Sequence, residues 1–457
     1  MNHLSRRALL AAATLPAAGL LAGCGDDGSP TAAFDPFGIT PERALEVVIF
    51  NGGFGDDYAK AHEELYRKRF PRAQIKHTST KKIVGDLKGR FDSGDPPDVM
   101  NNDGADQFTT GELVNDGALL DLTELLDSPS LDDPGVKVRD TLLPGTVESG
   151  TFNGKVYGLN YMYTVFGLFY DATRWQAAGW SPPQTWEQFL ELAPKIKAAG
   201  VAPFAHAGKY PYYMGWTIAD WIHKAGGAAA AAAIDNLEPG AWQHPAVLAS
   251  VELAIELVGR GFVLAGSDKL SHTESQQALI DGRAAMLPCG TWLENEMKAT
   301  LPASVKLTIV PVWSVGTGDT MPYGSARAGA SGTFAVPTMA KNKAGGLEYL
   351  RVMLSKAGAG RFSELTNSLA SRKGSADGVV GSSGLASANE VVKGAGNNLM
   401  TWKFNDWYGA LDKAWQATIA DVMSGALKRP ADFASRMQAA ADGVARDSSI
   451  TKFRRDA

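Results

Sequence analysis

The chain has 457 residues, of which 45% are hydrophobic, and its 44 Lys and Arg nearly balance 49 Asp and Glu, for a formal net charge of −5. This length is enough for two or three domains with buried cores. The charge balance argues against a nucleic-acid partner and a polybasic membrane surface, because both need clustered cations. The only cysteines are Cys24 and Cys289, so no intramolecular disulfide can form if Cys24 is modified, and apolar burial must stabilise the fold.

The first 23 residues have the three parts of a secretory signal peptide. Arg6-Arg7 precede an uncharged apolar run, Ala8 to Ala22, that is too short for a stable transmembrane helix. Ser-Arg-Arg-x-Leu-Leu is similar to a twin-arginine export signal, and Leu-Ala-Gly-Cys resembles the bacterial lipobox, whose cysteine is acylated. We therefore expect a signal peptide at 1–23, a flexible tether at 24–40 and a lipid anchor at Cys24, which places the protein on the extracytoplasmic face of the membrane.

The first part of the mature chain alternates strand and helix patterns. Hydrophobic runs predict strands at 45–50, 74–78 and 98–101, and helical spacing predicts helices over 56–70 and around Ile83, Leu87 and Phe91. This order is typical of a parallel sheet covered by helices. Ligands bind at the carboxyl ends of such strands, which are the polar, Gly-containing segments 51–57 and 101–106. Gly52-Gly53-Phe54-Gly55 is not the dinucleotide fingerprint.

The rest of the chain predicts further helices and short strands. Thr185 is an expected N-cap for a helix that ends near 199. Further helices are expected at 216–224, 228–233, 245–259, 407–423 and 431–445. Further strands are expected at 284–287, 307–310 and 333–336. The Gly- and Ala-rich stretch 328–332 predicts a loose segment before the last of these strands.

Motifs for catalysis or metal binding are missing from the sequence. The histidines share no metal-ligand spacing, and no HExxH, CxxC, EF-hand, Walker or G-x-S-x-G pattern occurs, so we expect neither a metal nor another cofactor. A single cysteine such as Cys289 is more commonly a small buried thiol than a nucleophile. Acidic residues are abundant, but a glycosidase needs two carboxylates that converge on one bond, and the sequence does not show convergence.

Aromatic residues gather in four clusters beside Gly, Asn and Glu. These clusters are at 157–163, 209–214, 290–295 and 402–408. A ring supplies a stacking face and its polar neighbours supply directional donors and acceptors, which is what a neutral polyol requires. For any one of these rings, core packing and ligand contact are about equally expected.

Three features point to one family: the signal with its lipobox, Pro96-Pro97-Asp98-Val99, and Gly290-Thr291-Trp292. With them, the chain resembles the sugar-binding lipoproteins of ABC importers over essentially the whole mature chain. Four longer segments are similar to the actinobacterial members that bind N-acetylglucosamine and chitobiose: 49–58, 208–214, 234–239 and 289–297. In one departure from many relatives, Asn160 stands where Pro would follow Gly158-Leu159, and this side chain could alter which sugar oxygens are recognised.

The resemblance implies an α/β, two-lobed periplasmic-binding-protein-like (Venus-flytrap) fold with the sugar between the lobes. We expect the N-terminal lobe at 41–165 and 326–372 and the C-terminal lobe at 166–325 and 373–457. Three crossing segments would join the lobes near 160–170, 322–332 and 371–375. The expected ligand contacts are Asn51, Phe54, Asp57, Asn102, Asp103, Asn160, Tyr161, Tyr210, Tyr212, Trp292, Glu294, Asn295, Ser331 and Arg372.

Three functions are compatible with these features. The first is a monomeric, non-catalytic receptor that binds N-acetylglucosamine or chitobiose and delivers it to the permease subunits of an ABC importer. The second is a secreted glycosidase or chitin-modifying enzyme, and the third is a lipoprotein that senses sugar for a signalling partner. Product formation from chitobiose would separate the enzyme from the receptor.

Overall fold

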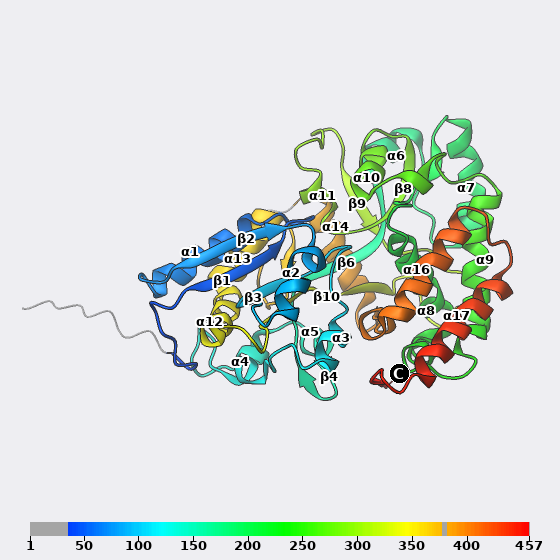
Figure 1. Cartoon of the computed structure of the whole chain (residues 1–457). Helices are drawn as coiled ribbons and strands as arrows, with labels where there is room; N and C mark the ends of the chain where they lie inside the picture. Colours follow the sequence, from blue (N-terminus) through cyan, green and yellow to red (C-terminus); the bar gives the residue numbers. More distant parts are fainter. Residues whose placement is uncertain (1–34, 377–381, 457) are drawn as a thin grey trace, which may run out of the picture. The chain divides into compact units, whose positions relative to one another are not determined.

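A ten-stranded mixed sheet runs through the protein, whose computed structural model describes residues 35–376 and 382–456 (Figure 1). The main strand order is β2-β1-β3-β10-β6-β8-β7. These strands are β1 (Leu45–Phe50), β2 (Ile75–Thr80), β3 (Val99–Asn102), β6 (Leu159–Asp171), β7 (Ala202–Phe204), β8 (Ala284–Gly290) and β10 (Ala326–Ala335). Two short strands pair with β6, namely β9 (Leu307–Val310) and β11 (Leu369–Ala370), and β12 (Leu399–Met400) pairs with β10.

The first three strands form the parallel sheet that the sequence predicts. β1 pairs in parallel with both β2 and β3, and α1 (Asp57–Arg69) and α2 (Ile83–Asp92) connect them. The apolar side chains of β1 pack with α1, α12 (Lys343–Met353) and α13 (Lys356–Thr366) in one core that draws its buried residues from 45–162 and 334–370. This core fixes the positions of the loops that follow β1 and β3.

Strand β6 is shared between two groups of strands. Its first part pairs antiparallel with β10 as far as Val165, opposite Ala328, and the next residue, Phe166, pairs with Gly290 of β8. Because β10 also pairs with β3, the two long strands β6 and β10 connect the parallel part of the sheet to β8 and β9. They contain most of two of the segments predicted as crossings, 160–170 and 322–332.

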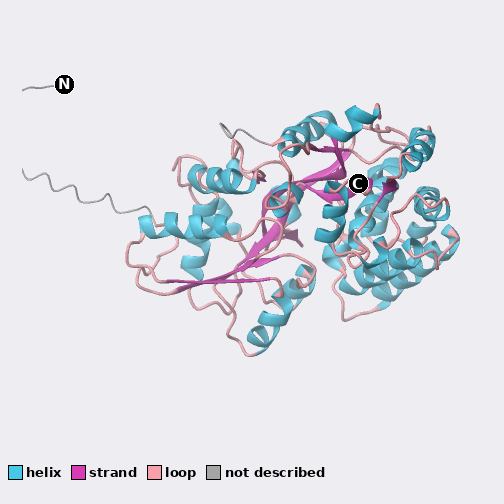
Figure 2. Ribbon diagram, turned by 90° about the horizontal axis from the view of Figure 1, so that it is seen from above, coloured by secondary structure: helices cyan, strands magenta, loops and turns pink. Residues whose placement is uncertain are grey.

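The second group of strands is covered by longer helices, and Figure 2 shows helices on both sides of the strands. These are α6 (Ala172–Ala178), α7 (Trp186–Ala198), α8 (Tyr212–Asp235), α9 (Pro245–Gly259), α10 (His272–Ile280), α14 (Ser383–Ala395), α16 (Gly409–Met423) and α17 (Pro430–Arg446). Their core contains most of the tryptophans, and Trp221, Trp242 and Trp313 are fully buried there. Packing, rather than ligand contact, therefore explains much of the aromatic content.

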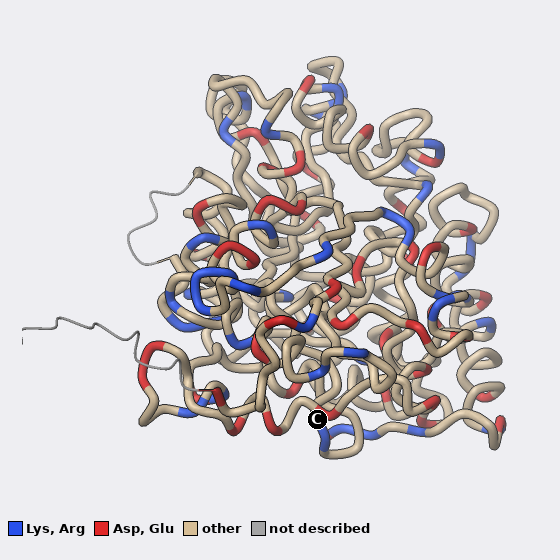
Figure 3. Tube along the Cα trace, turned by 60° about the vertical axis from the view of Figure 1, so that its left-hand side comes forward, with Lys and Arg blue, Asp and Glu red and all other residues tan. Residues whose placement is uncertain are grey.

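Short elements complete the described chain. They are α3 (Thr110–Asn115), α4 (Thr123–Asp127), α5 (Thr146–Ser149), α11 (Leu293–Glu296), α15 (Phe404–Trp407), the hairpin strands β4 (Thr151–Phe152) and β5 (Lys155–Val156), and three 3₁₀ turns at Val138–Thr141, Ala241–Gln243 and Ser267–Lys269. Lys and Arg are interspersed with Asp and Glu along the trace (Figure 3), as the near-neutral composition leads one to expect.

The predicted elements correspond closely to the observed ones, with one error. Thr185 does cap α7, accepting a hydrogen bond from the Gln188 backbone N–H at 3.2 Å. The predicted helices 216–224 and 228–233 both lie in α8, which Gly227 interrupts with a φ of +72°. The prediction of a loose segment at 328–332 is wrong, because these residues belong to β10 and pair with β6. The expected lipidation site, Cys24, lies outside the described residues.

Candidate functional site

A cavity of about 860 Å³ lies where the loops after β1 and β3 meet strands β6 and β10 and helices α8, α15 and α16. This volume falls in the usual range for a small-molecule site. The loop after β1 contributes Gly52 to Phe54, and the loop after β3 contributes Asp103 to Ala105. The carboxyl ends of β1 and β3, where the sequence predicts ligand binding, therefore border one cavity.

Five aromatic side chains, which we call the aromatic wall, line one part of the cavity. They are Phe166, Tyr210, Tyr212, Trp216 and Trp292. Trp216 is the central ring, with centroid distances of 4.8 Å to Phe166, 4.9 Å to Tyr212 and 5.7 Å to Trp292. Edge and tilted contacts of this kind hold rings rigidly while leaving apolar surface for a ligand.

Strands β6 and β10 supply a polar floor, made of Asn160, Thr164, Ser331 and Thr333. The hydroxyl oxygens of Thr164 and Ser331 lie 2.7 Å apart, and Asn160 Oδ1 accepts a hydrogen bond from Thr333 at 2.7 Å. Asn160 Nδ2 donates to Ser149 at 2.8 Å. Alternation along a strand places Asn160 and Thr164 on the same face. Each hydroxyl keeps further donor or acceptor capacity for a ligand.

Asp103, which directly follows β3, places a carboxylate in the cavity lining. Burial raises its pKa to about 6, although its Oδ1 accepts a hydrogen bond from the Gly104 backbone at 2.8 Å. The negative charge of Asp103 also contributes, after burial, to the raised pKa of Tyr212 on the aromatic wall. A Cβ at Gly332 would lie 3.3 Å from Asp103 Oδ2 and 2.3 Å from Met162 Sδ, so a side chain at this position would crowd both residues.

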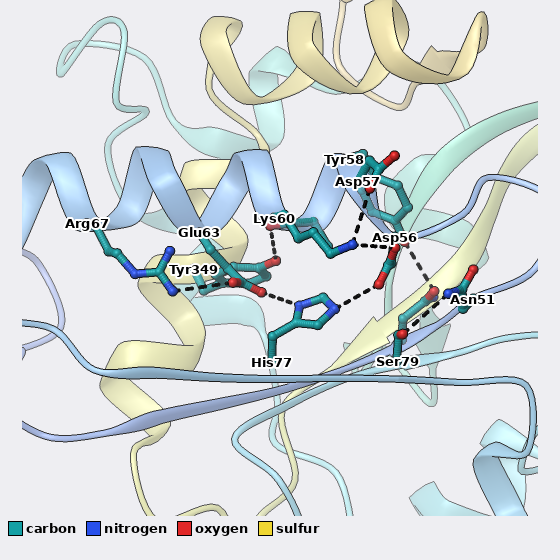
Figure 4. A network of polar contacts seen from close by, with 12 residues as sticks. Asn51, Asp56, Asp57, Tyr58, Lys60, Glu63, Arg67, His77, Ser79 and Tyr349 are labelled. Atoms are coloured by element: carbon teal, nitrogen blue, oxygen red, sulfur yellow. Dashed lines mark hydrogen bonds and ion pairs between the residues drawn. The ribbon is translucent and has the colours of Figure 1, made fainter.

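A network of charged side chains fixes the loop after β1 (Figure 4). His77 of β2 contacts Glu63 at 2.5 Å and Asp56 at 3.1 Å; Asp56 is the N-cap of α1, and Glu63 lies in the middle of this helix. Hydrogen bonds and negative charge from Glu63 and Asp56 favour the charged imidazole and raise the pKa of His77. Burial lowers this pKa, but its effect is the smaller one. The same loop is held on its other side, where Asn51 donates to Ser79 at 3.3 Å.

Seven of the fourteen predicted ligand contacts line this cavity. They are Phe54, Asp103, Asn160, Tyr210, Tyr212, Trp292 and Ser331. Phe166, Thr164 and Trp216 also line it and were not predicted. Trp216 could have been found from its spacing of four residues from Tyr212 on a helix, and Thr164 from its spacing of four residues from Asn160 on a strand.

The other seven predicted residues do not line the cavity, and they bond within the protein. Tyr161 is in the core, where its hydroxyl donates to the Met353 carbonyl at 3.1 Å. Arg372 donates to Asp132 at 3.0 Å and to the Leu354 carbonyl at 2.9 Å. The side chain of Asp57 is 71% exposed.

Four of these residues support the walls of the cavity. Asn51 bonds to Ser79, and the amide of Asn102 holds the following loop through the Phe108 backbone N–H and carbonyl at 2.8 and 3.0 Å. Glu294 accepts hydrogen bonds from Ser382 and from the Gly384 backbone at the start of α14. Asn295 donates to the Gly53 carbonyl at 2.6 Å.

The described residues offer little for other chemistry. Within 35–376 and 382–456, no group of three His, Cys, Asp or Glu side chains could hold a metal ion. Cys289 is a buried free thiol whose pKa burial raises, which opposes formation of the nucleophilic thiolate. None of the helices in these ranges is long and apolar enough to cross a membrane.

Comparison with known proteins places the chain in a family. Residues 71–360 match the family described as bacterial extracellular solute-binding protein. The chain is 33% identical over 429 residues to the diacetylchitobiose binding protein NgcE of Streptomyces coelicolor, covering 92% of this chain and 89% of that protein.

Solved structures agree on the fold. A chitin oligosaccharide binding protein is similar with a TM-score of 0.72 at 20% identity, covering 88% of this chain and 99% of that one. The raffinose complex of the solute-binding protein RafE has a TM-score of 0.68 at 17% identity and covers 87% of this chain and 99% of that one. These likenesses show a mixed α/β periplasmic-binding-protein fold. This chain therefore belongs to the bacterial extracellular solute-binding proteins, a family of binding proteins rather than enzymes.

Proposed function

We propose that this protein binds an amino sugar outside the cell, N-acetylglucosamine or its disaccharide diacetylchitobiose, and delivers it to the permease of an ABC importer. The observation that carries the proposal is the meeting of the aromatic wall, the polar floor and Asp103 in one cavity of about 860 Å³. The similarity to NgcE, a diacetylchitobiose binding protein, supports the choice of sugar.

The chemistry of the cavity suits an N-acetylated sugar. Trp216 and Trp292 can cover the apolar face of a pyranose ring or an acetyl methyl group. Asp103 can accept hydrogen bonds from hydroxyl or amide N–H groups, and Thr164 and Ser331 can donate or accept. Since a polar site leaves its own buried groups unpaired when the ligand lacks a partner, sugars without the acetamido group should bind much more weakly.

We further propose that binding is coupled to closure of two lobes, at 41–165 with 326–372 and at 166–325 with 373–457. The change of partner strand at Val165 and Phe166 supports this boundary, as does the core confined to 45–162 and 334–370. A motion between the lobes would change contacts on both sides of the cavity, because its lining comes from both.

The location of the protein is the remaining part of the proposal. Membership of an extracellular family agrees with the signal peptide at 1–23. The sequence Leu21-Ala22-Gly23-Cys24 supports lipid anchoring at Cys24, which would hold the receptor near a membrane permease.

Calorimetric titration of the purified mature protein tests the sugar. We expect N-acetylglucosamine or diacetylchitobiose to bind, with glucose and maltose binding far more weakly. Tight binding of maltose with no response to diacetylchitobiose would contradict the amino-sugar assignment and leave the receptor function standing. Chromatography of the ligand after incubation should recover it intact, and release of N-acetylglucosamine from diacetylchitobiose would contradict a purely binding role.

A further inference from the structure

Helix α8 carries a buried carboxylate one turn after Trp216 of the aromatic wall. Asp220 follows Trp216 by four residues, so both lie on the same side of the helix, about 6 Å apart along its axis. Asp220 is 2% exposed and does not line the cavity. Its Oδ1 accepts a hydrogen bond from Arg327 Nε at 2.8 Å. Because Arg327 is the second residue of β10, this ion pair ties α8 to the start of that strand.

The guanidinium of Arg327 contacts the aromatic wall. Its Cζ lies over the ring of Phe166, 5.7 Å from the ring centroid, which is the geometry of a cation–π contact. Phe166 in turn makes edge contacts with Trp216 and Trp292, at centroid distances of 4.8 and 5.5 Å. Arg327 and all three rings line the cavity. Arg327 therefore contacts the ring that packs on both tryptophans of the wall.

These contacts meet where β6 changes its partner strand. Ala328, the neighbour of Arg327, pairs with Val165, whereas Phe166 pairs with Gly290 of β8. Backbone pairing thus sets the position of Val165 relative to β10, but it does not extend to Phe166. The side chain of Arg327 supplies the contact between β10 and the Phe166 ring.

A second cation on α8 lies close to the same carboxylate. Lys224, one turn after Asp220, is 0% exposed, and its Nζ donates to the Tyr323 carbonyl at 2.5 Å. Burial raises the pKa of Asp220, and the charges of Arg327 and Lys224 oppose this effect. Because both charges lose hydration, a buried ion pair often stabilises a fold no better than apolar side chains would, so its presence points to a role in geometry.

We infer that Asp220 is a positioning residue for sugar binding: it holds the Arg327 guanidinium over Phe166, and Arg327 thereby fixes the rings on which the sugar packs. This inference rests on the proposed function and adds to the binding machinery a residue outside the cavity lining. Packing on an aromatic ring does not depend on one particular hydroxyl group. Loss of Asp220 should therefore weaken the binding of every sugar that the protein accepts by a similar factor.

A double-mutant cycle tests whether Asp220 acts through Arg327. Asp220→Asn is made in the wild type and in an Arg327→Met background, and the full-length mature variants are titrated with N-acetylglucosamine, diacetylchitobiose, glucose and maltose. We expect Asp220→Asn to weaken binding roughly 3- to 10-fold in the wild type, and by less than about 2-fold once Arg327 is replaced. A purely structural role of Asp220 would instead give the same factor in both backgrounds.

Arg327→Lys provides a second background. Lysine keeps a positive charge for Asp220 but lacks the planar guanidinium that lies over Phe166. This variant should bind sugar more weakly with little change in its urea unfolding midpoint, and Asp220→Asn should again cost it less than about 2-fold in affinity. The matched control is Glu348→Gln, since Glu348 is a buried carboxylate paired with Arg351 at 2.7 Å and neither residue lines the cavity. It should lower the unfolding midpoint and leave affinity unchanged.

Equal losses from Asp220→Asn in all backgrounds, or no loss in the wild type, would overturn the positioning role. The cycle uses whichever of the four sugars binds the wild type. If only glucose and maltose bind, the proposed amino sugar fails while the cycle still decides the role of Asp220. If none of the four binds, both proposals fail.

Discussion

The side-chain amide of Asn295 donates a hydrogen bond to the backbone carbonyl of Gly53 across 2.6 Å. Gly53 follows β1, whereas Asn295 lies in α11 after β8, so the bond joins segments that belong to different lobes in our proposal. A Cβ at Gly53 would come within 2.8 Å of Trp292, which shows how closely the same segments pack. The geometry identifies Asn295 as a residue that holds the two sides of the cavity together.

Asn295→Ala should therefore weaken ligand binding without changing its selectivity. Loss of one hydrogen bond costs about 0.5–1.5 kcal/mol, or roughly 2- to 10-fold in affinity, if the bond forms only when the cavity is closed. Because Asn295 does not line the cavity, every sugar should lose affinity by the same factor. Calorimetry with a series of sugars measures this factor.

A control for this substitution is Asn236→Ala. Asn236 makes a comparable bond to the Arg455 carbonyl at 2.9 Å, and neither residue lines the cavity. It should lower the free energy of unfolding and leave affinity unchanged. A sugar-dependent loss in Asn295→Ala would show instead that this amide contacts the ligand directly.

Trp292→Ala should weaken sugar binding by roughly 10- to 1000-fold, because ligand-facing aromatic rings commonly contribute a few kcal/mol. Trp292 lines the cavity, and its ring centroid lies 5.5 Å from that of Phe166. Trp180→Ala is the matched control, since Trp180 packs against Trp175 outside this cavity. Unchanged affinity in a folded Trp292 variant would assign this ring to packing alone.

The parallel part of the fold could be predicted because its sequence is locally consistent. β1 is a continuous hydrophobic run, and the helices that follow it have clear spacing and terminators. β10 could not be predicted at 328–332, because Gly and Ala have weak strand propensity and the pairing is supplied by β6, a partner about 170 residues distant in the chain. Long-range pairing of this kind leaves no local signal.

The site was predictable to the level of segments and not of side chains. The Asn160-Tyr161 pair and the Asn102-Asp103 pair show why. Adjacent residues in or at the end of a strand point to opposite sides, so Asn160 and Asp103 line the cavity while Tyr161 enters the core and Asn102 bonds to the Phe108 backbone. The phase of each strand depends on the packed sheet, which the sequence of one segment does not reveal.

His77 predicts a pH dependence of stability. Its pKa is raised in the folded protein by Glu63 and Asp56, so its stabilising contribution is fully present below the ordinary pKa of about 6.5 and is lost as the pH rises through the raised value. His77→Gln should lower the free energy of unfolding by about 1–3 kcal/mol at pH 6 and by less at pH 9. Urea unfolding at both pH values measures the difference.

Glu63→Gln provides the companion measurement, because it removes the main partner of His77 and should also reduce the pH dependence. A His77 variant that loses the same stability at pH 6 and pH 9 would show that packing, and not charge, makes this residue important. The side chain of His77 is 19% exposed, so screening by salt should be modest.

Cys24→Ala should release the protein into the medium or leave it unprocessed, if Cys24 carries the lipid anchor. Cell fractionation followed by immunoblotting measures the distribution. Cys289→Ala is the matched control, because it removes the other cysteine of the chain and should leave the protein with the membrane. Membrane retention of a fully processed Cys24→Ala protein would contradict the anchor.

Asp103→Asn should stabilise the empty protein at neutral pH and weaken its binding of sugar. Burial raises the pKa of Asp103 to about 6, above the value of about 3.9 for an unfolded chain, so its favourable contribution is complete below pH 3.9 and is lost as the pH rises through 6. At pH 7.5 the ionised carboxylate therefore costs the fold on the order of 1–3 kcal/mol, which the asparagine removes. Urea unfolding should show the variant to be more stable at pH 7.5, with little difference at pH 4. Calorimetry at pH 7.5 should show weaker sugar binding, because an amide oxygen is a poorer acceptor than a carboxylate. Opposite changes in stability and affinity are what a carboxylate retained for ligand binding should give. A variant that is less stable at pH 7.5 and binds sugar normally would instead make Asp103 a structural residue.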